Sequence, residues 1–178
     1  MGSVSEAVVE EHPMRKIRIG KVVVNVCVGK SGEPLEKAMK ILHSLTGQKP
    51  CIRKAKKTIK NFGIRRGEPI ACAATLRGEK AIDFLRRALE AIGNKLEASC
   101  FDEFGNFSFG IREHIEIPGV KYDPKLGMIG MDVCVNLERP GFRVERRRVK
   151  SSKVGRKHLV SKEESIHFIK SNFRVEVV

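Results

Sequence analysis

The sequence predicts an α+β fold in which an antiparallel or mixed β-sheet carries helices on one face. Several segments of strand length alternate apolar and polar residues or hold short β-branched runs. Three other segments repeat apolar residues at helical spacing. The order is strand, helix, two strands, helix, strands, helix, which is typical of a sheet with one helix-covered face and one free face.

The first half of the chain supplies a strand, a helix and two further strands. Residues 16–28 are rich in valine and isoleucine and predict a strand. Apolar spacing predicts a helix over residues 34–45, with a proline in its first turn and a glycine positioned to cap its C-terminus. Strands are predicted at residues 51–54 and 70–76, with a basic loop between them.

The second half adds two helices and the remaining strands. Gly78 is predicted to open a helix whose apolar face runs from Ala81 to Ile92 and which Gly93-Asn94 closes. Residues 128–137 alternate like a half-buried strand. Ser161 and Glu164 have the spacing of a capping box and predict the start of the last helix. The glycine- and aromatic-rich stretch between these elements predicts hairpins and loops. Its phenylalanines are interpreted as core residues of a hairpin rather than stacking platforms for bases: Phe101, Phe104, Phe107 and Phe109.

The charge balance predicts a polyanionic partner. The 178 residues include 35 Lys and Arg against 21 Asp and Glu, a formal net charge of +14. Such a surplus disfavours a compact chain unless it serves a polyanion. No apolar run reaches the ~20 residues that span a bilayer, so we expect nucleic acid and no membrane. Residues 1–13 are predicted to be a flexible tail, and residues 14–178 a single RNA-binding domain.

Catalysis, metals and cofactors are not expected. Gly29-Lys30-Ser31 lies between a strand and a helix, as in a phosphate-binding loop, but the first glycine of that motif would fall on Val24 inside a strand. A nucleotide hydrolase using Lys30 is therefore a minor alternative. The five cysteines form no C-x-x-C pair and have no ligand spacing with histidine, so we predict reduced, buried thiols and no zinc.

Two basic segments are the strongest functional signal. The first is a predicted protruding loop at residues 53–67, in which apolar residues and glycines interrupt the charge, a composition that favours a shaped finger over a solvated charge run. The second follows the strand that ends near residue 137 and is predicted to contact RNA phosphates. The first set is Arg53, Lys54, Lys56, Lys57, Lys60, Phe62, Arg65 and Arg66; the second is Arg143, Arg146, Arg147, Arg148, Lys150, Lys153, Arg156 and Lys157.

Short motifs along the chain resemble one known family. They include Pro13-Met-Arg-Lys-Ile, Leu45-Thr-Gly-Gln-Lys-Pro50, Phe62-Gly-Ile-Arg-Arg, Thr75-Leu-Arg-Gly78, Phe109-Gly-Ile-Arg-Glu-His114 and Tyr122-Asp-Pro. In order and spacing they are similar to the universal large-subunit ribosomal protein family five, numbered eleven in eukaryotes. Glu138-Arg-Pro-Gly141 resembles the archaeal branch first and the eukaryotic branch second.

The resemblance implies a ferredoxin-like or RRM-like sheet in the central protuberance of the large ribosomal subunit, in the cytoplasm. It implies a sheet face that binds 5S rRNA through Asn25, Gln48 and Thr75, with Arg77 beside them, although Asn25 and Thr75 could instead satisfy local backbone groups. It also implies large-subunit rRNA, other proteins on 5S rRNA, a P-site tRNA touched by the finger, and a small-subunit head protein as partners. A free regulatory RNA binder is a further alternative.

Overall fold

A five-stranded antiparallel sheet, in the order β2-β3-β1-β6-β5, forms the centre of the protein. The structure, a computed structural model, describes residues 12–178, so the predicted tail lies outside the described residues apart from His12 and Pro13. Its strands are β1 (Arg18–Cys27), β2 (Cys51–Lys54), β3 (Pro69–Leu76), β5 (Asn106–Ile111) and β6 (Met131–Glu138).

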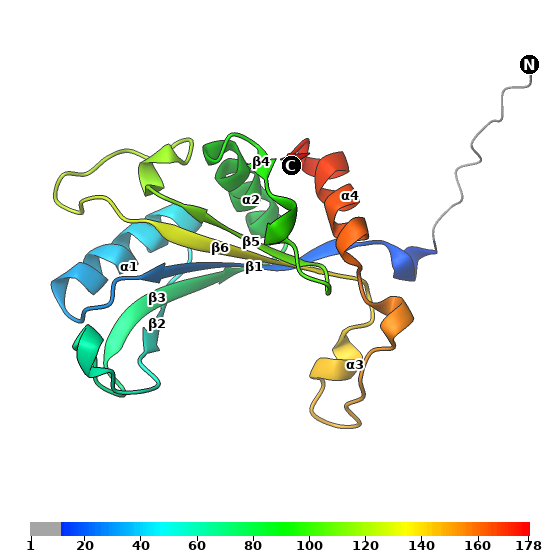
Figure 1. Ribbon diagram of the computed structural model, residues 1–178, viewed down its shortest axis with the longest axis horizontal. Coiled ribbons are helices and arrows are strands. Elements are labelled where there is room, and N and C mark those ends of the chain that lie inside the picture. The colour runs from blue at the N-terminus through cyan, green and yellow to red at the C-terminus, as the bar shows by residue number, and fades with distance from the viewer. Residues whose placement is uncertain (1–11) are drawn as a thin grey trace, which may run out of the picture.

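Three helices, α1 (Glu33–Thr46), α2 (Glu79–Ala91) and α4 (Lys162–Phe173), all lie on one face of the sheet (Figure 1). Two short strands, β4 (Lys95–Leu96) and β7 (Glu176–Val177), pair in parallel beside them. The predicted α+β class and the single helix-covered face are therefore confirmed. The other face, here called the open face, is covered by no helix of the described chain.

Local signals in the sequence set the ends of the helices. α1 ends at Gly47, which has the left-handed φ of 62° that glycine tolerates best. α4 starts with the predicted capping box, in which the Glu164 backbone N–H donates to Ser161 Oγ (3.3 Å) and the Ser161 N–H donates to Glu164 Oε2 (3.0 Å). Both ends thus satisfy backbone groups that a bare helix would leave unpaired.

The alternation in β1 and β6 divides core from open face. Val22, Val24 and Val26 are 1 % exposed or less and pack under the helices, as do Val133 and Val135 of β6. The residues between them point to the open face, since successive side chains of a strand alternate. Phe101, Phe107 and Phe109 join the same core, as predicted, while Phe104 is exposed.

Two predictions about this part of the sheet were wrong. β6 starts at Met131 and not at residue 128, because its ladder with β5 ends at the pair Ile111 and Met131. The cysteines were predicted to be buried, yet Cys27, Cys51 and Cys134 are exposed. Cysteine suits both faces of a strand sterically, so residue type alone did not place them.

Candidate nucleic-acid interface

The open face is built from rows of small, mostly neutral side chains. The register pairs Asn25 of β1 with Ala73 on one side and Asp132 on the other, and Asp132 with Gly110 of β5. Paired residues of antiparallel strands share a face, so these four form one row. The next row runs Thr75, Val23, Cys134 and Ser108. Short side chains leave a shallow surface that another macromolecule can approach closely.

Within the described chain, the polar side chains predicted to bind RNA have no hydrogen-bond partners. Asn25 and Gln48 are half-buried, and Thr75 and Arg77 are exposed. Throughout residues 12–178 none of the four side chains makes a hydrogen bond; Gln48 is engaged only through its backbone, whose carbonyl oxygen lies 3.0 Å from His43 Nδ1. The alternative that Asn25 and Thr75 satisfy local backbone groups therefore finds no support.

A second polar group lies toward the β5 edge of the same face. Asn136 Nδ2 donates to Asn106 Oδ1 (2.6 Å), and Asn106 Nδ2 donates to Asp102 Oδ2 (2.6 Å). The Asn136 Oδ1 atom is buried and has no partner in the described chain. Although its residue is exposed, the Cys134 thiol is partly desolvated by its neighbours, which raises its pKa, and the charge of Asp132 raises it further. This thiol therefore stays protonated, and we assign it no nucleophilic role.

The predicted finger at residues 53–67 is an ordered extension of the β2–β3 hairpin. Ala55 N–H donates to the Glu68 carbonyl (2.8 Å), and Ile59 and Ile64 pair through two backbone hydrogen bonds. Gly63 turns the tip with a φ of 67°. Phe62, at 75 % exposure, is the most exposed aromatic side chain of the described residues.

Glu68 fastens the base of the finger. Its Oε2 accepts the Arg65 backbone N–H (2.9 Å), and its Oε1 accepts the Ser31 hydroxyl (3.0 Å). These hydrogen bonds, led by the one from Arg65, hold the pKa of Glu68 below its usual value. The finger's own cations form no ion pair within residues 12–178: Arg53, Lys54, Lys56, Lys57, Lys60, Arg65 and Arg66.

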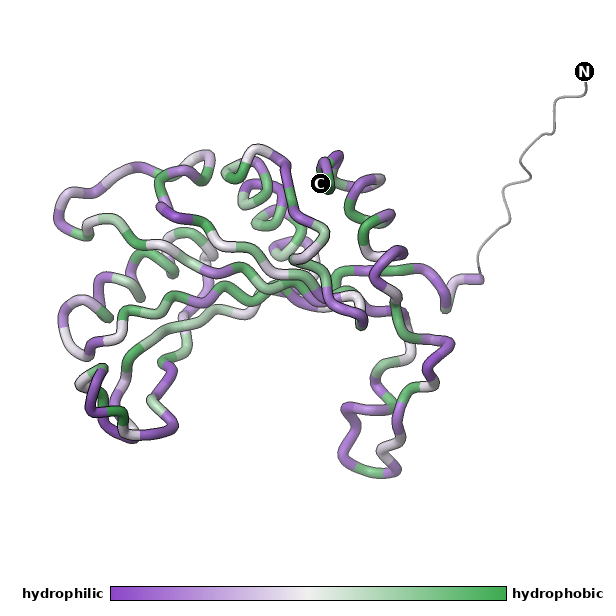
Figure 2. Tube along the Cα trace, viewed as in Figure 1, coloured by the Kyte–Doolittle hydropathy of each residue, from purple (hydrophilic) through white to green (hydrophobic). Residues whose placement is uncertain are grey.

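The second basic segment forms a projection, residues 140–158, at the opposite end of the sheet. It contains the short helix α3 (Arg143–Arg146) and turns back so that His158 Nε2 lies 2.8 Å from the Pro140 carbonyl oxygen. Finger and projection both extend to the open side of the sheet (Figure 1), and both carry stretches of strongly hydrophilic residues (Figure 2). Together they flank the open face with positive charge.

Two of the eight cations predicted to contact phosphates are engaged within the protein. Arg146 pairs with Glu138 (2.5 Å), and Arg147 Nε donates to the Lys150 carbonyl (2.7 Å). The other side chains form no ion pair or hydrogen bond in the described part of the chain, and all are exposed: Arg143, Arg148, Lys150, Lys153, Arg156 and Lys157.

Glu138 anchors the base (the root) of the projection to the sheet on the open face. Its carboxylate is 7 % exposed and contacts two arginines, Arg18 of β1 (3.3 Å) and Arg146 of α3. Gly20, at a bulge in β1, makes room for it, because a Cβ there would lie 2.7 Å from the Glu138 carboxyl carbon. A buried carboxylate needs such partners, so it ties α3 to the sheet.

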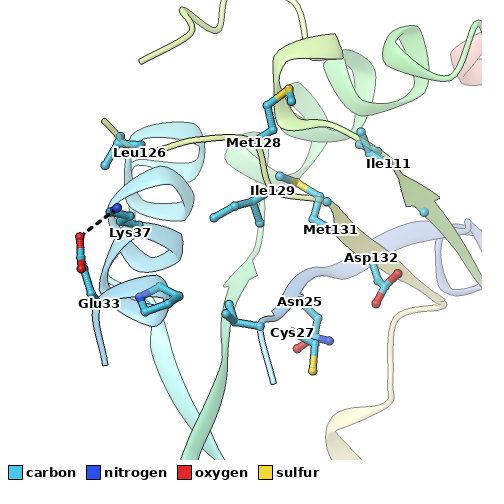
Figure 3. Close-up of a pocket in the computed structure, with 14 residues that line it drawn as sticks. Asn25, Cys27, Glu33, Lys37, Ile111, Leu126, Met128, Ile129, Met131 and Asp132 are labelled. Carbon is cyan, nitrogen blue, oxygen red and sulfur yellow. Dashed lines mark ion pairs between the residues drawn. The ribbon is translucent and has the colours of Figure 1, made fainter. Parts of the chain in front are cut away.

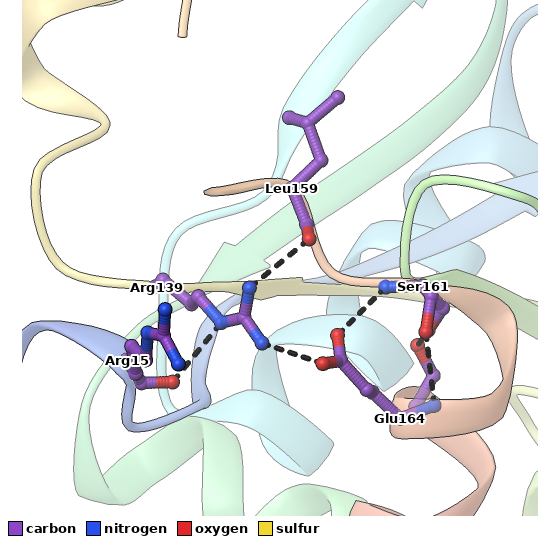
Figure 4. Close-up of polar contacts among 6 residues, drawn as sticks. Arg15, Arg139, Leu159, Ser161 and Glu164 are labelled. Atoms are coloured by element: carbon purple, nitrogen blue, oxygen red, sulfur yellow. Dashed lines mark hydrogen bonds and ion pairs between the residues drawn. The ribbon is translucent and has the colours of Figure 1, made fainter. Parts of the chain in front are cut away.

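Arg139 anchors the same root of the projection on the helix-covered face. Its guanidinium donates to the Arg15 carbonyl (3.0 Å), the Leu159 carbonyl (3.2 Å) and Glu164 Oε1 (2.7 Å), so it joins the end of β6 to the segment before β1 and to the start of α4 (Figure 4). Burial alone would raise the pKa of Glu164, but the Ser161 N–H and the Arg139 charge lower it overall. Arg139 thus fixes where the projection leaves the domain.

The site shows no constellation for catalysis. Val24, where the first glycine of a phosphate loop would stand, lies fully buried in β1. Within residues 12–178 no cluster of three or more His, Cys, Asp or Glu could hold a metal ion. Over the same residues, no helix is long and apolar enough to cross a membrane. Sequence reasoning missed Asp132, Glu138 and Arg139 as parts of the interface, although the alternation of β6 placed Asp132 opposite its buried residues.

Comparisons with known proteins agree with this architecture. Residues 12–65 match the family model for ribosomal protein L5, and residues 69–168 match the model for the C-terminus of the same ribosomal family. The chain is 56 % identical over 169 residues to large ribosomal subunit protein uL5 of Pyrobaculum aerophilum, covering 95 % of this chain and 94 % of that protein. The uL5 proteins of Sulfurisphaera tokodaii and Aeropyrum pernix are each 54 % identical, over 94 % and 93 % of this chain and 95 % and 87 % of their own lengths.

These matches bear out the predicted resemblance, including its archaeal branch, and the absence of an enzymatic role. The names of these relatives identify them as proteins of the large ribosomal subunit. The chain therefore belongs to the ribosomal protein L5 family, archaeal uL5 branch, and is a structural constituent of the large ribosomal subunit.

Proposed function

We propose that the open face binds 5S rRNA while the finger contacts the P-site tRNA. The observation that carries the first part is the set of unpaired polar side chains, led by Asn25 and Thr75, on a shallow face flanked by two basic extensions. Polar groups that lack protein partners are costly to desolvate unless a ligand satisfies them. RNA offers hydroxyls, phosphates and base edges as such partners.

The two kinds of surface have different tasks. Phosphate contacts from lysine and arginine fix position and give affinity, whereas neutral hydrogen-bonding groups on the open face select the RNA. The projection, with six exposed and unpaired cations, holds phosphates of 5S rRNA or of the neighbouring large-subunit rRNA. Contacts with other proteins on 5S rRNA and with a small-subunit head protein belong to the same proposal and follow from the family resemblance alone.

The finger is suited to a partner other than the RNA on the open face. Its hydrogen-bonded hairpin carries Phe62 at the tip, where an exposed aromatic ring can stack on a base or a ribose. Seven unpaired cations around it favour a phosphate backbone. A hydrogen-bonded, charged extension of this kind can reach a transfer RNA that binds only transiently.

The two surfaces are separable by mutation. We expect Asn25→Ala or Thr75→Ala to weaken 5S rRNA binding by roughly 1–2 kcal/mol each, because a polar group of the RNA loses its partner. Arg65→Ala combined with Arg66→Ala should leave 5S rRNA affinity nearly unchanged but slow translation by reconstituted ribosomes. Filter binding and a translation assay measure the two effects, with Lys80→Ala and Arg86→Ala on α2 as the charge-matched control for the finger.

A large loss of 5S rRNA affinity in the finger variant would place the finger on 5S rRNA and contradict the division of tasks. Unchanged affinity in both open-face variants would remove the open face from the 5S rRNA interface.

A further inference from the structure

A cavity of about 660 Å³ opens at the end of the open face, where β1 ends and β6 begins. Asn25, Cys27 and Asp132 line it from the strands, and Met128 and Ile129 line it from the loop before β6 (Figure 3). Cavities of this size can hold a small organic ligand, so a single nucleobase fits. The first turn of α1 lines the other side with Glu33 and Lys37, which form an ion pair (2.9 Å). The cavity therefore combines apolar walls with polar groups from both the sheet and α1.

Asp132 is the unexplained group in this cavity. It is exposed and has neither an ion pair nor a side-chain hydrogen bond within residues 12–178. The nearby acids differ, because Glu138 binds two arginines and Asp102 accepts from Asn106. A free carboxylate on a surface that meets a polyanion repels phosphates. It is tolerated there where the RNA presents N–H donors, or where a cation binds, rather than opposite phosphate oxygens.

The register sets the donor and acceptor pattern. Asn25 and Asp132 are direct cross-strand partners, so their Cβ atoms lie about 4.5–5.5 Å apart. They present an amide and a carboxylate side by side. Guanine is the base whose Watson–Crick edge carries two adjacent N–H donors, N1–H and N2–H, next to an acceptor, O6. Its carbonyl can accept from an amide while its two donors meet a carboxylate.

We propose that this cavity binds the Watson–Crick edge of an unpaired guanine of the bound RNA. Asp132 accepts from N1–H and N2–H, and Asn25 donates to O6, where the cavity meets the open face. The proposal rests on the proposed function, since it assumes that the open face carries 5S rRNA. Asp132 thereby becomes a specificity-determining residue.

The substitution Asp132→Asn tests the proposal against simple electrostatics. It keeps the size of the side chain and removes one negative charge, so electrostatics alone predicts tighter RNA binding. A carboxylate that accepts two guanine protons predicts the opposite, a loss of about tenfold or more for 5S rRNA. Asp83→Asn, at an exposed position of α2, makes the same charge change on the helix-covered side and should not weaken binding.

The base is identified by interference mapping. Transcripts of an archaeal 5S rRNA with inosine at random guanosine positions are partitioned into bound and free fractions. Inosine lacks N2–H, so wild-type protein should exclude it at one unpaired position, and Asp132→Asn should lose that exclusion while keeping any others. The same comparison is repeated without Mg²⁺, where the loss caused by Asp132→Asn should persist.

Three results would overturn the guanine cavity while leaving the proposed function in place: no inosine-sensitive position, equal affinity of wild type and Asp132→Asn, or a loss that vanishes without Mg²⁺. The last would assign a hydrated cation to Asp132. If the wild-type protein fails to prefer 5S rRNA over an unrelated structured RNA, the proposed function fails and the cavity assignment falls with it.

Discussion

Replacement of Arg139 by methionine should lower the free energy of unfolding by about 3 kcal/mol, because a buried guanidinium that donates three hydrogen bonds is lost. Methionine fills much of the same space, so the effect reports on the polar contacts. The Glu164 partner is partly exposed, at 42 %, and water can replace its share. Most of the lost free energy of unfolding therefore comes from the hydrogen bonds to the carbonyls of Arg15 and Leu159.

Thermal unfolding would show the change as a fall in Tm of roughly 6–12 °C for a chain of this size. Arg18→Met is the matched control, because Arg18 is 60 % exposed and shares Glu138 with Arg146. We expect it to cost less than about 1 kcal/mol. Equal Tm values for Arg139→Met and wild type would show that Arg139 does not hold the root of the projection.

Neutralising the projection should have the largest effect on RNA affinity. We expect replacement of four unpaired cations by glutamine to weaken 5S rRNA binding on the order of a hundredfold or more near physiological salt. Each lost phosphate contact also removes about 0.7–0.9 from the slope of log K against log salt, so the slope should fall by about 3. The four are Arg143, Arg148, Lys153 and Lys157.

The control carries the same charge change on the opposite side of the molecule, on α1, α2 and α4: Lys40, Lys80, Arg86 and Lys170 to glutamine. It should change the slope far less, because distant exposed charges are screened. An equal loss of affinity in both variants would mean that net charge alone drives binding. An unchanged slope in the projection variant would place the projection on an RNA other than 5S rRNA.

Much of the fold was predictable because local signals and tertiary structure agree. The strand 51–54 and the capping box at Ser161 are present as predicted. The start of β6 was mispredicted because Met128 and Ile129 continue the apolar residues of the strand, while the ladder with β5 ends at the pair Ile111 and Met131. The length of that ladder depends on tertiary pairing and leaves no periodic signal.

The candidate site was predictable in part. The basic segments follow from composition, and the polar positions in β1 and β3 from the family resemblance. The neighbours of Asn25 did not follow, because they depend on the register between β1 and β6, which no local pattern fixes. Glu138 and Arg139 stood out only as a motif. Their roles in anchoring the projection depend on partners up to 124 residues away in the sequence.

The most direct test of the central claim is the affinity of the wild-type protein for 5S rRNA and for an unrelated structured RNA as salt is raised. Counterion release weakens every phosphate contact with salt, whereas hydrogen bonds from the open face to one particular RNA persist. If the open face recognises 5S rRNA, its advantage over the unrelated RNA should stay large at high salt. If both RNAs fall together to the same weak affinity, only the basic segments bind, and the assignment of the open face to 5S rRNA is wrong.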